Sequence, residues 1–370
     1  MRAVFAIKSM NTAAGGAERV LAEVVNGLAV RGHDLSVVTF DGVGRSFYPL
    51  SDAVQRYDLD VGRVGESTPR GELVATVPRL RRTVTSLHPD VVVGFMHSMF
   101  VPLGFALLGS GIPVVASEHA GMDHYRTAQL DRALLRAVPW LTVASTIPSD
   151  EVRAAFPARL RRRMVTIRNP VSLPNVGVTG QLDDGRLGGV LLSVGRFSVE
   201  KNHRDLIAAF SQVVVDFDGW TLRFAGDGAL RDELKRQVRN LGLGSKVQFA
   251  GTVRDIASEY ADADIVAVPS LHESFGLVTA EALAAGRPVV GFADCPGTRE
   301  LVHHETNGLL VGPEPDRASA LAAGLRRLIA DGELRARLGE AGPASVDRFS
   351  PARVVDRWEQ LLLSCASLRS

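Results

Sequence analysis

The amino-acid sequence predicts an α/β protein made of two doubly wound domains in tandem that face each other across an interdomain cleft. Three observations lead to this fold class. The chain has 370 residues, more than one hydrophobic core usually supports. Short apolar runs alternate with longer segments of helical character, a pattern that requires parallel strands. This alternation occurs twice, and a stretch rich in glycine and proline separates the two series.

The first series opens with a short buried strand at residues 3–7, which a Gly15-Gly16 turn separates from a helix over residues 17–31. A second strand is expected at residues 35–39. The uncharged stretch from 91 to 117 is long enough for a membrane span, but polar and glycine-proline breaks divide it into strand, helix and strand. Further strands of this domain are expected at residues 91–93, 114–116, 141–144 and 165–167.

The second series supplies the strands of the other domain, expected at residues 190–194, 222–225, 247–249, 265–268, 289–291 and 308–311. The joint falls within residues 169–189, where prolines and glycines interrupt the hydrophobic periodicity. We therefore place the two domains at residues 1–172 and 173–350. Apolar residues recur at helical spacing over residues 351–366, and Trp358 in this helix is expected to pack in a core.

Composition and charge exclude several classes of function. Lys and Arg total 42 against 41 for Asp and Glu, so no nucleic acid partner is expected. Cys295 and Cys365 are the two cysteines, which argues against a disulfide framework. The apolar run near the N-terminus is too short for a secretory signal, because Lys8 follows it at once. These observations predict a cytoplasmic protein.

The most informative segment is Glu273-Ser-Phe-Gly-Leu-Val-Thr-Ala-Glu281, in which two carboxylates bracket the start of a predicted helix. Gly276 lies near that start, and Gly286 is placed to end the helix in a left-handed conformation. The free N–H groups of a helix N-terminus suit a phosphate, whereas carboxylates accept hydrogen bonds from hydroxyls. A ligand with both phosphates and sugars is therefore expected. The alternative is a surface helix with a solvated glutamate.

The turns after the first strand of each domain point to the same kind of ligand. Gly15-Gly16 lets backbone N–H groups approach a phosphate or an acceptor, although a plain loop explains these glycines as well. Arg196 can hold a diphosphate through its planar guanidinium, and Lys201 adds a mobile charge. The alternative for these two cations is an exposed pair that binds Glu200 or Asp205.

Three later turns complete the candidate site. Ala225-Gly-Asp-Gly228 and Gly251-Thr-Val253-Arg254 end two strands, and a nucleoside base can rest against Val253, although turn formation alone also explains both. Ser117-Glu-His119 ends a strand of the first domain, where His119 can donate to a sugar hydroxyl or a phosphate. We expect no cofactor and no obligatory metal, with cationic side chains and a helix dipole stabilising a leaving diphosphate.

Together these motifs resemble those of retaining glycosyltransferases of family 4, in the two-domain GT-B class, over nearly the whole chain. The resemblance rests on Gly-Gly-Ala-Glu-Arg at 15–19, Ser-Glu-His at 117–119, Asn169-Pro-Val171, Gly195-Arg196 with Glu200-Lys-Asn202, Ala-Gly-Asp-Gly at 225–228, Glu273-x7-Glu281 and Asn307-Gly-Leu-Leu310. It implies two tandem Rossmann-like domains, with the acceptor on the N-terminal domain and the nucleotide sugar on the C-terminal domain. The C-terminal helix, residues 351–370, would return to the first domain.

The resemblance also implies a role for each matching residue. Glu281 would bind the ribose hydroxyls of the donor, and Glu273 would contact hydroxyls of the transferred sugar. Arg196 and Lys201 would hold the diphosphate, and His119 would lie beside the hydroxymethyl group of the sugar. The expected catalytic residues are Glu273, His119, Arg196 and Lys201, and the expected donor-binding residues are Gly16, Arg196, Lys201, Val253, Ser274, Phe275, Gly276, Leu277 and Glu281. The sugar would keep its anomeric configuration, with the leaving phosphate helping to deprotonate the acceptor.

A narrower resemblance concerns the donor. Ser117-Glu-His119 together with Phe292-Ala-Asp-Cys-Pro-Gly-Thr-Arg-Glu300 is similar to the branch that uses UDP-N-acetylgalactosamine and related UDP-hexoses. The usual Thr-Gly-Pro-Arg-Glu of that branch is contracted here to Gly-Thr-Arg-Glu, in a loop expected near the sugar pocket. The resemblance therefore implies a UDP-sugar and leaves the individual sugar open.

The expected acceptor is a hydroxyl of a glycan, a lipid-linked molecule or a small molecule. The first domain carries two basic segments, which consist of Arg79, Arg81, Arg82, Arg159, Arg161, Arg162 and Arg163. These segments can meet a lipid-linked diphosphate or an anionic membrane. Such contact would place the protein peripherally on the inner face of the membrane, and a solvated basic face is the alternative. Two rival functions remain, a non-hydrolysing sugar-nucleotide epimerase and a catalytically silent subunit that binds a sugar nucleotide.

Overall fold

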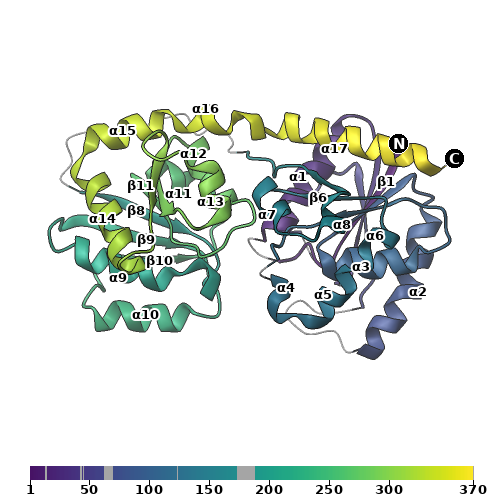
Figure 1. Ribbon diagram of the computed structural model, residues 1–370, viewed down its shortest axis with the longest axis horizontal. Coiled ribbons are helices and arrows are strands. Elements are labelled where there is room, and N and C mark those ends of the chain that lie inside the picture. Colours follow the sequence, from purple (N-terminus) through teal and green to yellow (C-terminus); the bar gives the residue numbers. More distant parts are fainter. Residues whose placement is uncertain are drawn as a thin grey trace. The chain divides into compact units, whose positions relative to one another are not determined.

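The computed structural model describes residues 1–12, 15–41, 44, 46–61, 70–122, 124–172 and 188–369. The chain divides into two compact units (Figure 1). Unit 1 consists of Met1–Pro170 and Pro351–Ser370, and unit 2 consists of Val171–Ser350. Most of the predicted joint, residues 173–187, lies outside the described residues.

The described part of unit 1 contains a parallel sheet of seven strands in the order β3-β2-β1-β4-β5-β6-β7. The chain builds this sheet outward from β1, first on one side and then on the other, as doubly wound folds do. The strands are β1 (Arg2–Ile7), β2 (Asp34–Thr39), β3 (Val54–Asp58), β4 (Val91–Phe95), β5 (Val114–Ser117), β6 (Ala144–Ile147) and β7 (Met164–Thr166).

Helices cover both faces of this sheet, and successive residues of β1 point to opposite faces and so enter different cores. Val4 packs in a core with Leu80 of α2 and Met99 of α3. Phe5 points the other way, and its ring centroid lies 6.4 Å from that of Trp358 in α17, which packs on α1. The helices of unit 1 are α1 (Gly16–Val30), α2 (Arg70–Ser86), α3 (His97–Ala106), α4 (His124–Thr127), α5 (Gln129–Leu135), α6 (Val138–Leu141), α7 (Asp150–Ala154), α8 (Ala158–Arg161), α17 (Pro351–Ala366) and the 3-10 turn η3 (Ser367–Arg369).

Unit 2 repeats the same strand order. Its described residues form a parallel sheet of six strands, β10-β9-β8-β11-β12-β13. Numbered within each unit, both sheets therefore begin 3-2-1-4-5-6, the order found in nucleotide-binding doubly wound proteins. The strands are β8 (Gly188–Val194), β9 (Gly219–Ala225), β10 (Val247–Gly251), β11 (Ile265–Val268), β12 (Val289–Phe292) and β13 (Gly308–Val311). The predicted fold class is confirmed.

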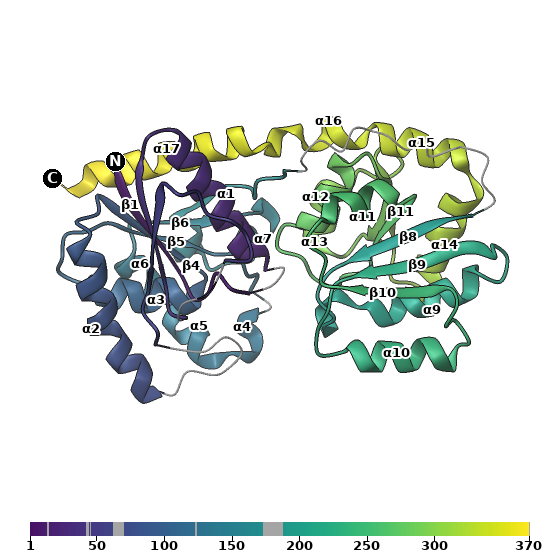
Figure 2. The same ribbon diagram turned by 180° about the vertical axis from the view of Figure 1, so that it is seen from behind.

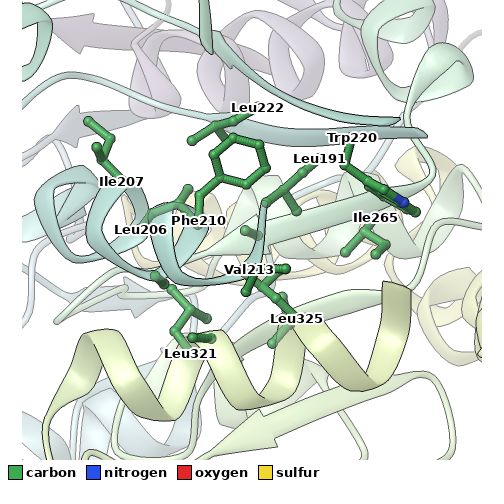
Figure 3. Close-up of a cluster of buried hydrophobic side chains, with 14 of the residues drawn as sticks. Leu191, Leu206, Ile207, Phe210, Val213, Trp220, Leu222, Ile265, Leu321 and Leu325 are labelled. Atoms are coloured by element: carbon green, nitrogen blue, oxygen red, sulfur yellow. The ribbon is translucent and has the colours of Figure 1, made fainter. Parts of the chain in front are cut away.

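Two cores flank the sheet of unit 2. Leu191 of β8 packs with Phe210 of α9 and Leu325 of α14 in the core drawn in Figure 3. The next residue, Leu192, packs on the opposite face with Leu283 of α12. Figure 2 shows α9 and α10 on one side of this sheet and α11 and α12 on the other. The helices are α9 (His203–Val213), α10 (Arg231–Asn240), α11 (Ile256–Asp262), α12 (Leu277–Ala284), α13 (Pro296–Leu301), α14 (Arg317–Ala330), α15 (Gly332–Glu340), α16 (Gly342–Val346) and the 3-10 turns η1 (Val199–Lys201) and η2 (Asp347–Phe349).

The strand predicted at residues 141–144 is wrong, because this segment divides between α6 and β6. Leu141 ends α6 and packs closely on α3, where a Cβ built on Gly104 would come within 2.7 Å of the Leu141 Cβ. The hydroxyl of Thr142 donates to the carbonyl oxygen of Val138 at 2.9 Å. These contacts hold Leu141 in a helical turn although its sequence neighbours read as a strand.

Two other elements test the sequence prediction. The edge strand β3, Val-Gln-Arg-Tyr-Asp, was not predicted, because only Val54 is buried and the segment has no apolar run. The predicted helix at residues 351–366 is confirmed as α17, and Trp358 is 2% exposed, which confirms its core position. Sequence patterns thus identified most of the buried strands, misplaced β6 and missed the polar edge strand β3.

Candidate active site

In unit 2, the strand order reverses between β8 and β11, which are hydrogen-bonded neighbours. The chain after β8 carries Arg196 and Lys201, and the chain after β11 carries Glu273. Connections leave the two strands in opposite directions at such a reversal, so the carboxyl edge opens there to a ligand. The two loops are tied together by the N–H of Leu271, which donates to the carbonyl oxygen of Glu200 at 2.8 Å.

Lys201 and Glu273 form the central polar contact of these loops. The Nζ of Lys201 lies 2.5 Å from Oε1 of Glu273, which also accepts a hydrogen bond from Ser270 Oγ at 2.7 Å. The two side chains are 22% and 13% exposed. Lys201 therefore pairs with Glu273 and not with the neighbouring Glu200 or Asp205. A pair sheltered to this extent has a stronger electrostatic interaction than one in open water.

Arg196 lies on the surface of the same loop. Its side chain is exposed, and it makes no ion pair with another described residue. The next residue, Phe197, is fully buried and stacks edge-on with Phe224 of β9, their ring centroids 6.0 Å apart. The loop is therefore anchored by an aromatic residue while its guanidinium stays available to a ligand.

Glycines bring the ends of β8 and β9 together. A Cβ on Gly226 would come within 1.9 Å of the carbonyl oxygen of Gly195, and a Cβ on Gly228 within 2.6 Å of that of Phe197. Any side chain at these positions would push the two loops apart. The Ala-Gly-Asp-Gly motif thus has a packing role. Val253 follows the third strand end, beyond Gly251, and its half-buried side chain packs on the second core of unit 2.

The loop from Glu273 leads directly into α12. Gly276 precedes the first helical residue, Leu277, and has a φ of 85°, a left-handed conformation that favours glycine. Ser274 lies in the loop and is half-buried, whereas Phe275 is buried with its ring edge-on to Phe349 at 5.4 Å. The first N–H groups of a helix have no acceptor within it, so this turn presents free donors beside Glu273. The left-handed Gly286 beyond the helix, with a φ of 69°, agrees with the prediction.

The contracted Gly-Thr-Arg-Glu motif packs against the Glu273 loop. The N–H of Gly297 donates to the carbonyl oxygen of Glu273 at 3.0 Å. A Cβ on Gly297 would come within 2.7 Å of that oxygen and within 2.9 Å of the carbonyl carbon of Phe275. The start of α13 therefore supports the backbone on both sides of Ser274.

Glu281 lies inside α12, one turn beyond Leu277, and is 3% exposed. Its Oε2 accepts a hydrogen bond from the hydroxyl of Tyr260 in α11 at 2.8 Å. Tyr260 is fully buried, so the carboxylate is held by a partner that the packing of α11 against the second core fixes in place. Tyr260 was not predicted, because nothing in its local sequence indicates that it lies beside Glu281.

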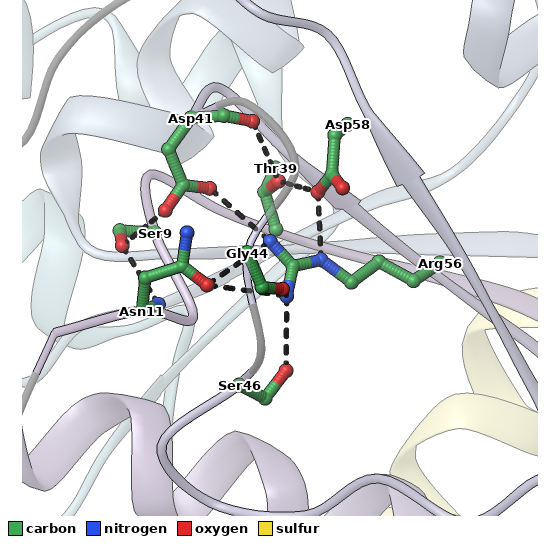
Figure 4. A network of polar contacts seen from close by, with 8 residues as sticks. All are labelled: Ser9, Asn11, Thr39, Asp41, Gly44, Ser46, Arg56 and Asp58. Atoms are coloured by element: carbon green, nitrogen blue, oxygen red, sulfur yellow. Dashed lines mark hydrogen bonds and ion pairs between the residues drawn. The ribbon is translucent and has the colours of Figure 1, made fainter.

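In unit 1, Gly16 begins α1 directly after Gly15, whose backbone is extended. The chain before this turn is held by Arg56 of β3 (Figure 4). The Nη1 of Arg56 donates to Asn11 Oδ1 at 3.3 Å, while its Nε donates to Asp58 Oδ1 at 2.6 Å. Asp41 accepts a hydrogen bond from Ser9 at 2.5 Å, so the ends of β1 and β2 belong to the same network. The polar residues of β3 that obscured this strand in the sequence are thus the ones that organise the loop after β1.

His119 follows β5 and lies half-buried against Phe95, with the two rings stacked at a centroid distance of 5.1 Å. Its Nε2 is 2.9 Å from the hydroxyl of Ser117. Removal from water lowers the pKa of His119 to about 4. The imidazole is therefore neutral at neutral pH, so one ring nitrogen can donate a hydrogen bond and the other can accept one.

Glu118, the middle residue of the Ser-Glu-His motif, is buried beneath this loop. Its Oε1 accepts hydrogen bonds from the N–H groups of His119 at 2.9 Å and Ala120 at 2.8 Å, and its Oε2 accepts one from the hydroxyl of Tyr125. Burial raises the pKa of Glu118 to about 7, which outweighs the opposing effect of these hydrogen bonds. The motif in the sequence contains Glu118 but does not indicate its role.

The structure brings Lys201, Glu273 and the start of α12 together in unit 2, with Gly297 from the loop expected near the sugar pocket. Ser270 and Tyr260 are supporting residues that were not predicted. Gly16 and His119 belong to unit 1. None of the described helices is long and apolar enough to cross a membrane.

Comparison with known proteins gives the family. Residues 14–173 match the family described as "Glycosyltransferase Family 4", and residues 188–345 match "Glycosyl transferases group 1". The chain belongs to glycosyltransferase family 4 and has the GT-B fold. It is an enzyme that transfers a sugar from a nucleotide-sugar donor, as its motifs predicted.

Three proteins illustrate the range of this family. The chain is 25% identical to the "GalNAc-alpha-(1->4)-GalNAc-alpha-(1->3)-diNAcBac-PP-undecaprenol alpha-1,4-N-acetyl-D-galactosaminyltransferase" of Campylobacter jejuni, covering 98% of both chains. It is 28% identical to the phosphatidyl-myo-inositol mannosyltransferase of Mycobacterium tuberculosis, covering 90% of this chain and 89% of that protein. The structure of Anabaena HepE in complex with UDP and glucose superposes with a TM-score of 0.79, at 22% identity, over 98% of this chain and 100% of HepE.

Proposed function

We propose that this glycosyltransferase moves a hexose or an N-acetylhexosamine from a UDP-linked donor to a hydroxyl of a glycan, lipid-linked or small-molecule acceptor, with retention of configuration and without a metal. The observation that carries the proposal is the contact of Lys201 with Glu273 at the strand-order reversal of unit 2. It sets a cation suited to a diphosphate beside a carboxylate suited to sugar hydroxyls. The UDP bound to HepE and the N-acetylgalactosaminyl transfer named for the Campylobacter relative support a UDP-linked donor.

Each predicted residue has a proposed contact with the donor. Lys201 and the exposed Arg196 hold the diphosphate, with further N–H donors from Ser274, Phe275, Gly276 and Leu277 at the start of α12. Glu273 binds hydroxyls of the transferred sugar, Glu281 binds the ribose, and Val253 contacts the base. From unit 1, the backbone of Gly16 and the side chain of His119 complete the set.

The reaction breaks the bond between the anomeric carbon and the diphosphate oxygen. The acceptor oxygen forms the new bond on the same face of the sugar and passes its proton to the leaving diphosphate. Lys201, Arg196 and the positive end of the α12 dipole stabilise the charge that develops on the diphosphate. Because Ser270 also donates to Glu273, the carboxylate keeps its orientation toward the sugar when the ammonium of Lys201 contacts the diphosphate.

A panel of UDP-, GDP- and ADP-linked sugars, read by thermal shift and by slow donor hydrolysis, tests the donor without knowledge of the acceptor. UDP-sugars are expected to stabilise the protein and to be hydrolysed, and NMR is expected to show the α-anomer from an α-linked donor. A preference for GDP-sugars would overturn the UDP assignment. Interconversion of two sugar nucleotides without an acceptor would instead indicate an epimerase. Binding of a sugar nucleotide without any hydrolysis or transfer would indicate a catalytically silent subunit.

We also propose peripheral contact of unit 1 with an anionic membrane surface on the cytoplasmic side. Trp140 of α6 is 63% exposed, and the guanidinium of Arg159 lies 4.0 Å from the centroid of its ring. Arg161 and Arg162 are exposed in and after the neighbouring α8. An exposed tryptophan flanked by arginines is typical of surfaces that meet lipid headgroups.

A further inference from the structure

Three potential metal ligands from separate helices meet in unit 1. His97 is the first residue of α3, His124 is the first residue of α4, and Asp131 lies in α5. One ligand atom from each lies within 4.8 Å of the others. No other group of three or more such side chains was found among the residues that the structure describes. None of the three has a proposed contact with the donor.

The helices that carry these residues are fixed by a common core. Phe100 of α3, Tyr125 of α4 and Leu135 of α5 are buried together in it. Tyr125, next to His124 in the chain, is fully buried, and its ring stands nearly edge-on to His97 at 5.4 Å and to His124 at 5.2 Å. The positions of the three backbones are therefore set by packing and do not depend on the charged groups themselves.

The distances suit direct coordination. The Nε2 of His97 lies 3.4 Å from Oδ2 of Asp131, and two ligands of a tetrahedral zinc ion at about 2.0–2.1 Å are themselves about 3.3 Å apart. The rings of His97 and His124 have centroids 4.7 Å apart. His124 is exposed, so rotation of its side chain can shorten the remaining separation without disturbing the core.

The surroundings of His97 leave one ring nitrogen for an ion. Its Nδ1 is buried and has no hydrogen-bond partner among the described residues, whereas its Nε2 faces Asp131 and is the nitrogen that can coordinate. The preceding residue, Met96, has a φ of 66°, a conformation that costs a non-glycine residue on the order of 1–3 kcal/mol. This strained turn starts α3 at the end of β4, beside β1, where the strand order of unit 1 reverses.

We propose that His97, His124 and Asp131 bind one divalent transition-metal ion of the Zn²⁺ or Co²⁺ class, with a fourth position left to water or another ligand. Two imidazoles and one carboxylate favour such an ion over Mg²⁺ or Ca²⁺, which prefer oxygen ligands. This site differs from one for the leaving diphosphate, which Lys201 and Arg196 serve in the proposed function. It therefore stands even if the donor assignment fails.

The test is titration of the untagged, EDTA-treated full-length chain with Co²⁺, read by visible absorption and by calorimetry, followed by competition with Zn²⁺. One equivalent is expected to bind with the absorption bands of nitrogen-coordinated Co²⁺. His124→Gln and Asp131→Ala are each expected to weaken binding at least tenfold, since each removes a direct ligand. Both positions are partly or fully exposed, so these variants are expected to fold, which circular dichroism checks.

His304→Ala is the matched control. His304 also lies near a carboxylate, with Nε2 3.7 Å from Oε1 of Glu305, but no third ligand joins this pair among the residues that the structure describes. Its replacement is expected to leave Co²⁺ affinity unchanged. The proposal is overturned if the wild-type chain shows no saturable binding, if either His124→Gln or Asp131→Ala binds as the wild type does, or if His304→Ala loses the ion.

Discussion

At Glu273, one carboxylate oxygen serves two partners, the ammonium of Lys201 and the hydroxyl of Ser270. Such a carboxylate is oriented before any ligand arrives, and the energy of orienting it is not taken from donor binding. Glu281 lies one turn further along α12 and is oriented in the same way, by its hydrogen bond from Tyr260. The two carboxylates therefore differ in their surroundings as well as in their proposed roles.

Substitution of the two glutamates is expected to have different kinetic effects. Glu273→Gln keeps the shape of the side chain but removes the charge beside the transferred sugar, so kcat is expected to fall roughly 100-fold. Glu281→Ala removes a ribose contact, so the donor KM is expected to rise about tenfold with a smaller change in kcat. Steady-state kinetics with the donor found in the panel measures both. Arg239→Ala, at an exposed position of α10, serves as the control, and unchanged kinetics in both glutamate variants would refute the assignment.

Glu118, beneath the loop of His119, is expected to make the stability of the protein depend on pH. Its pKa rises from 4.5 in the unfolded chain to about 7 in the folded protein, so the folded state holds a proton that the unfolded state releases between these values. The stability that this group contributes is full below pH 4.5 and is lost as the pH rises through about 7. His119 acts in the opposite sense, because its pKa falls from 6.5 to about 4 and its contribution is lost as the pH falls.

Glu118→Gln isolates the effect of the carboxyl group. Glutamine keeps an oxygen for the two backbone N–H groups but does not titrate, while His119 is unchanged. The melting temperature of the variant is expected to match the wild type near pH 4.5 and to exceed it increasingly up to pH 7. Thermal melts across this range measure the difference, and parallel profiles for the two proteins would show that Glu118 does not titrate there.

The charged residues of the candidate site could be identified from sequence motifs, but the residues that form hydrogen bonds with them could not. Lys201 and Glu273 were recognisable because each follows a buried strand. Ser270 and Tyr260 were not, since a serine in a loop and a tyrosine in a helix have no distinctive pattern. Their roles depend on which side chain the fold brings beside them, and that is settled by packing across the sheet.

At the scale of elements, Gly297 links α13 to the loop before α12. A Cβ there would meet backbone atoms of Glu273 and Phe275, which cannot rotate away. Gly297→Ala is expected to displace this loop, to lower stability by about 1–3 kcal/mol and to reduce turnover. Urea unfolding and donor hydrolysis measure the two effects. Gly244→Ala, where a Cβ would meet nothing within 4 Å, is the control in the same unit and is expected to be nearly neutral.

The surface formed by α6 and α8 gives the prediction for membranes. Arg161→Ser with Arg162→Ser is expected to weaken binding to phosphatidylglycerol vesicles roughly 30-fold, because each arginine near an anionic surface contributes about 1 kcal/mol. Arg163 is left in place, since it donates to the carbonyl oxygens of Pro139 and Thr142 and supports α6. Co-sedimentation is the measurement.

A double variant of α10 is the matched control for this experiment. Arg236→Ser with Arg239→Ser removes the same charge from exposed positions of unit 2. It is expected to leave vesicle binding unchanged. Equal losses in both double variants would indicate a general charge effect, and no binding by the wild-type chain would discard the membrane surface.

Burial made most strands predictable from sequence. Most strands that lie between neighbours read as apolar runs, because both of their faces are covered by helices, whereas β6 is buried but contains Ser145 and Thr146. β3 lies at an edge and uses Arg56 and Asp58 for a polar network, so it had no such signal. At residues 141–144 the apolar residues were real, but their burial comes from packing of α6 on α3, which no local pattern reveals.

At the scale of the whole chain, the same strand order serves two purposes. The matched family segments, residues 14–173 and 188–345, correspond closely to the two units. Each unit places residues with a proposed role at the reversal of its strand order, Lys201 and Glu273 in one and His97 in the other. The fold could be predicted because the alternation of apolar strands and helical segments repeats along the whole chain. The roles of residues at the strand ends have no such repeat and differ between the two units.

Trp358 offers a test of how α17 contributes to unit 1. Its ring packs against Phe5 and Phe95 with centroids 6.4 and 6.0 Å away. Trp358→Ala is expected to lower the stability of unit 1 by about 3–5 kcal/mol, as truncation of a buried tryptophan does. Hydrogen exchange of the amides of β1 and β4 measures this unit by itself. Leu363→Ala, 48% exposed on the same helix, is expected to have little effect, and equal protection in both variants would contradict the packing role.

The position of α17 in the chain also determines the order in which the protein can be completed during synthesis. Residues 1–170 leave the ribosome long before Trp358 does, and until then Phe5 and Phe95 lack the ring that covers them. All of unit 2 is made in the interval. The nascent first unit must therefore wait with an exposed aromatic surface, and a chain stopped before residue 351 would keep that surface and remain prone to aggregation.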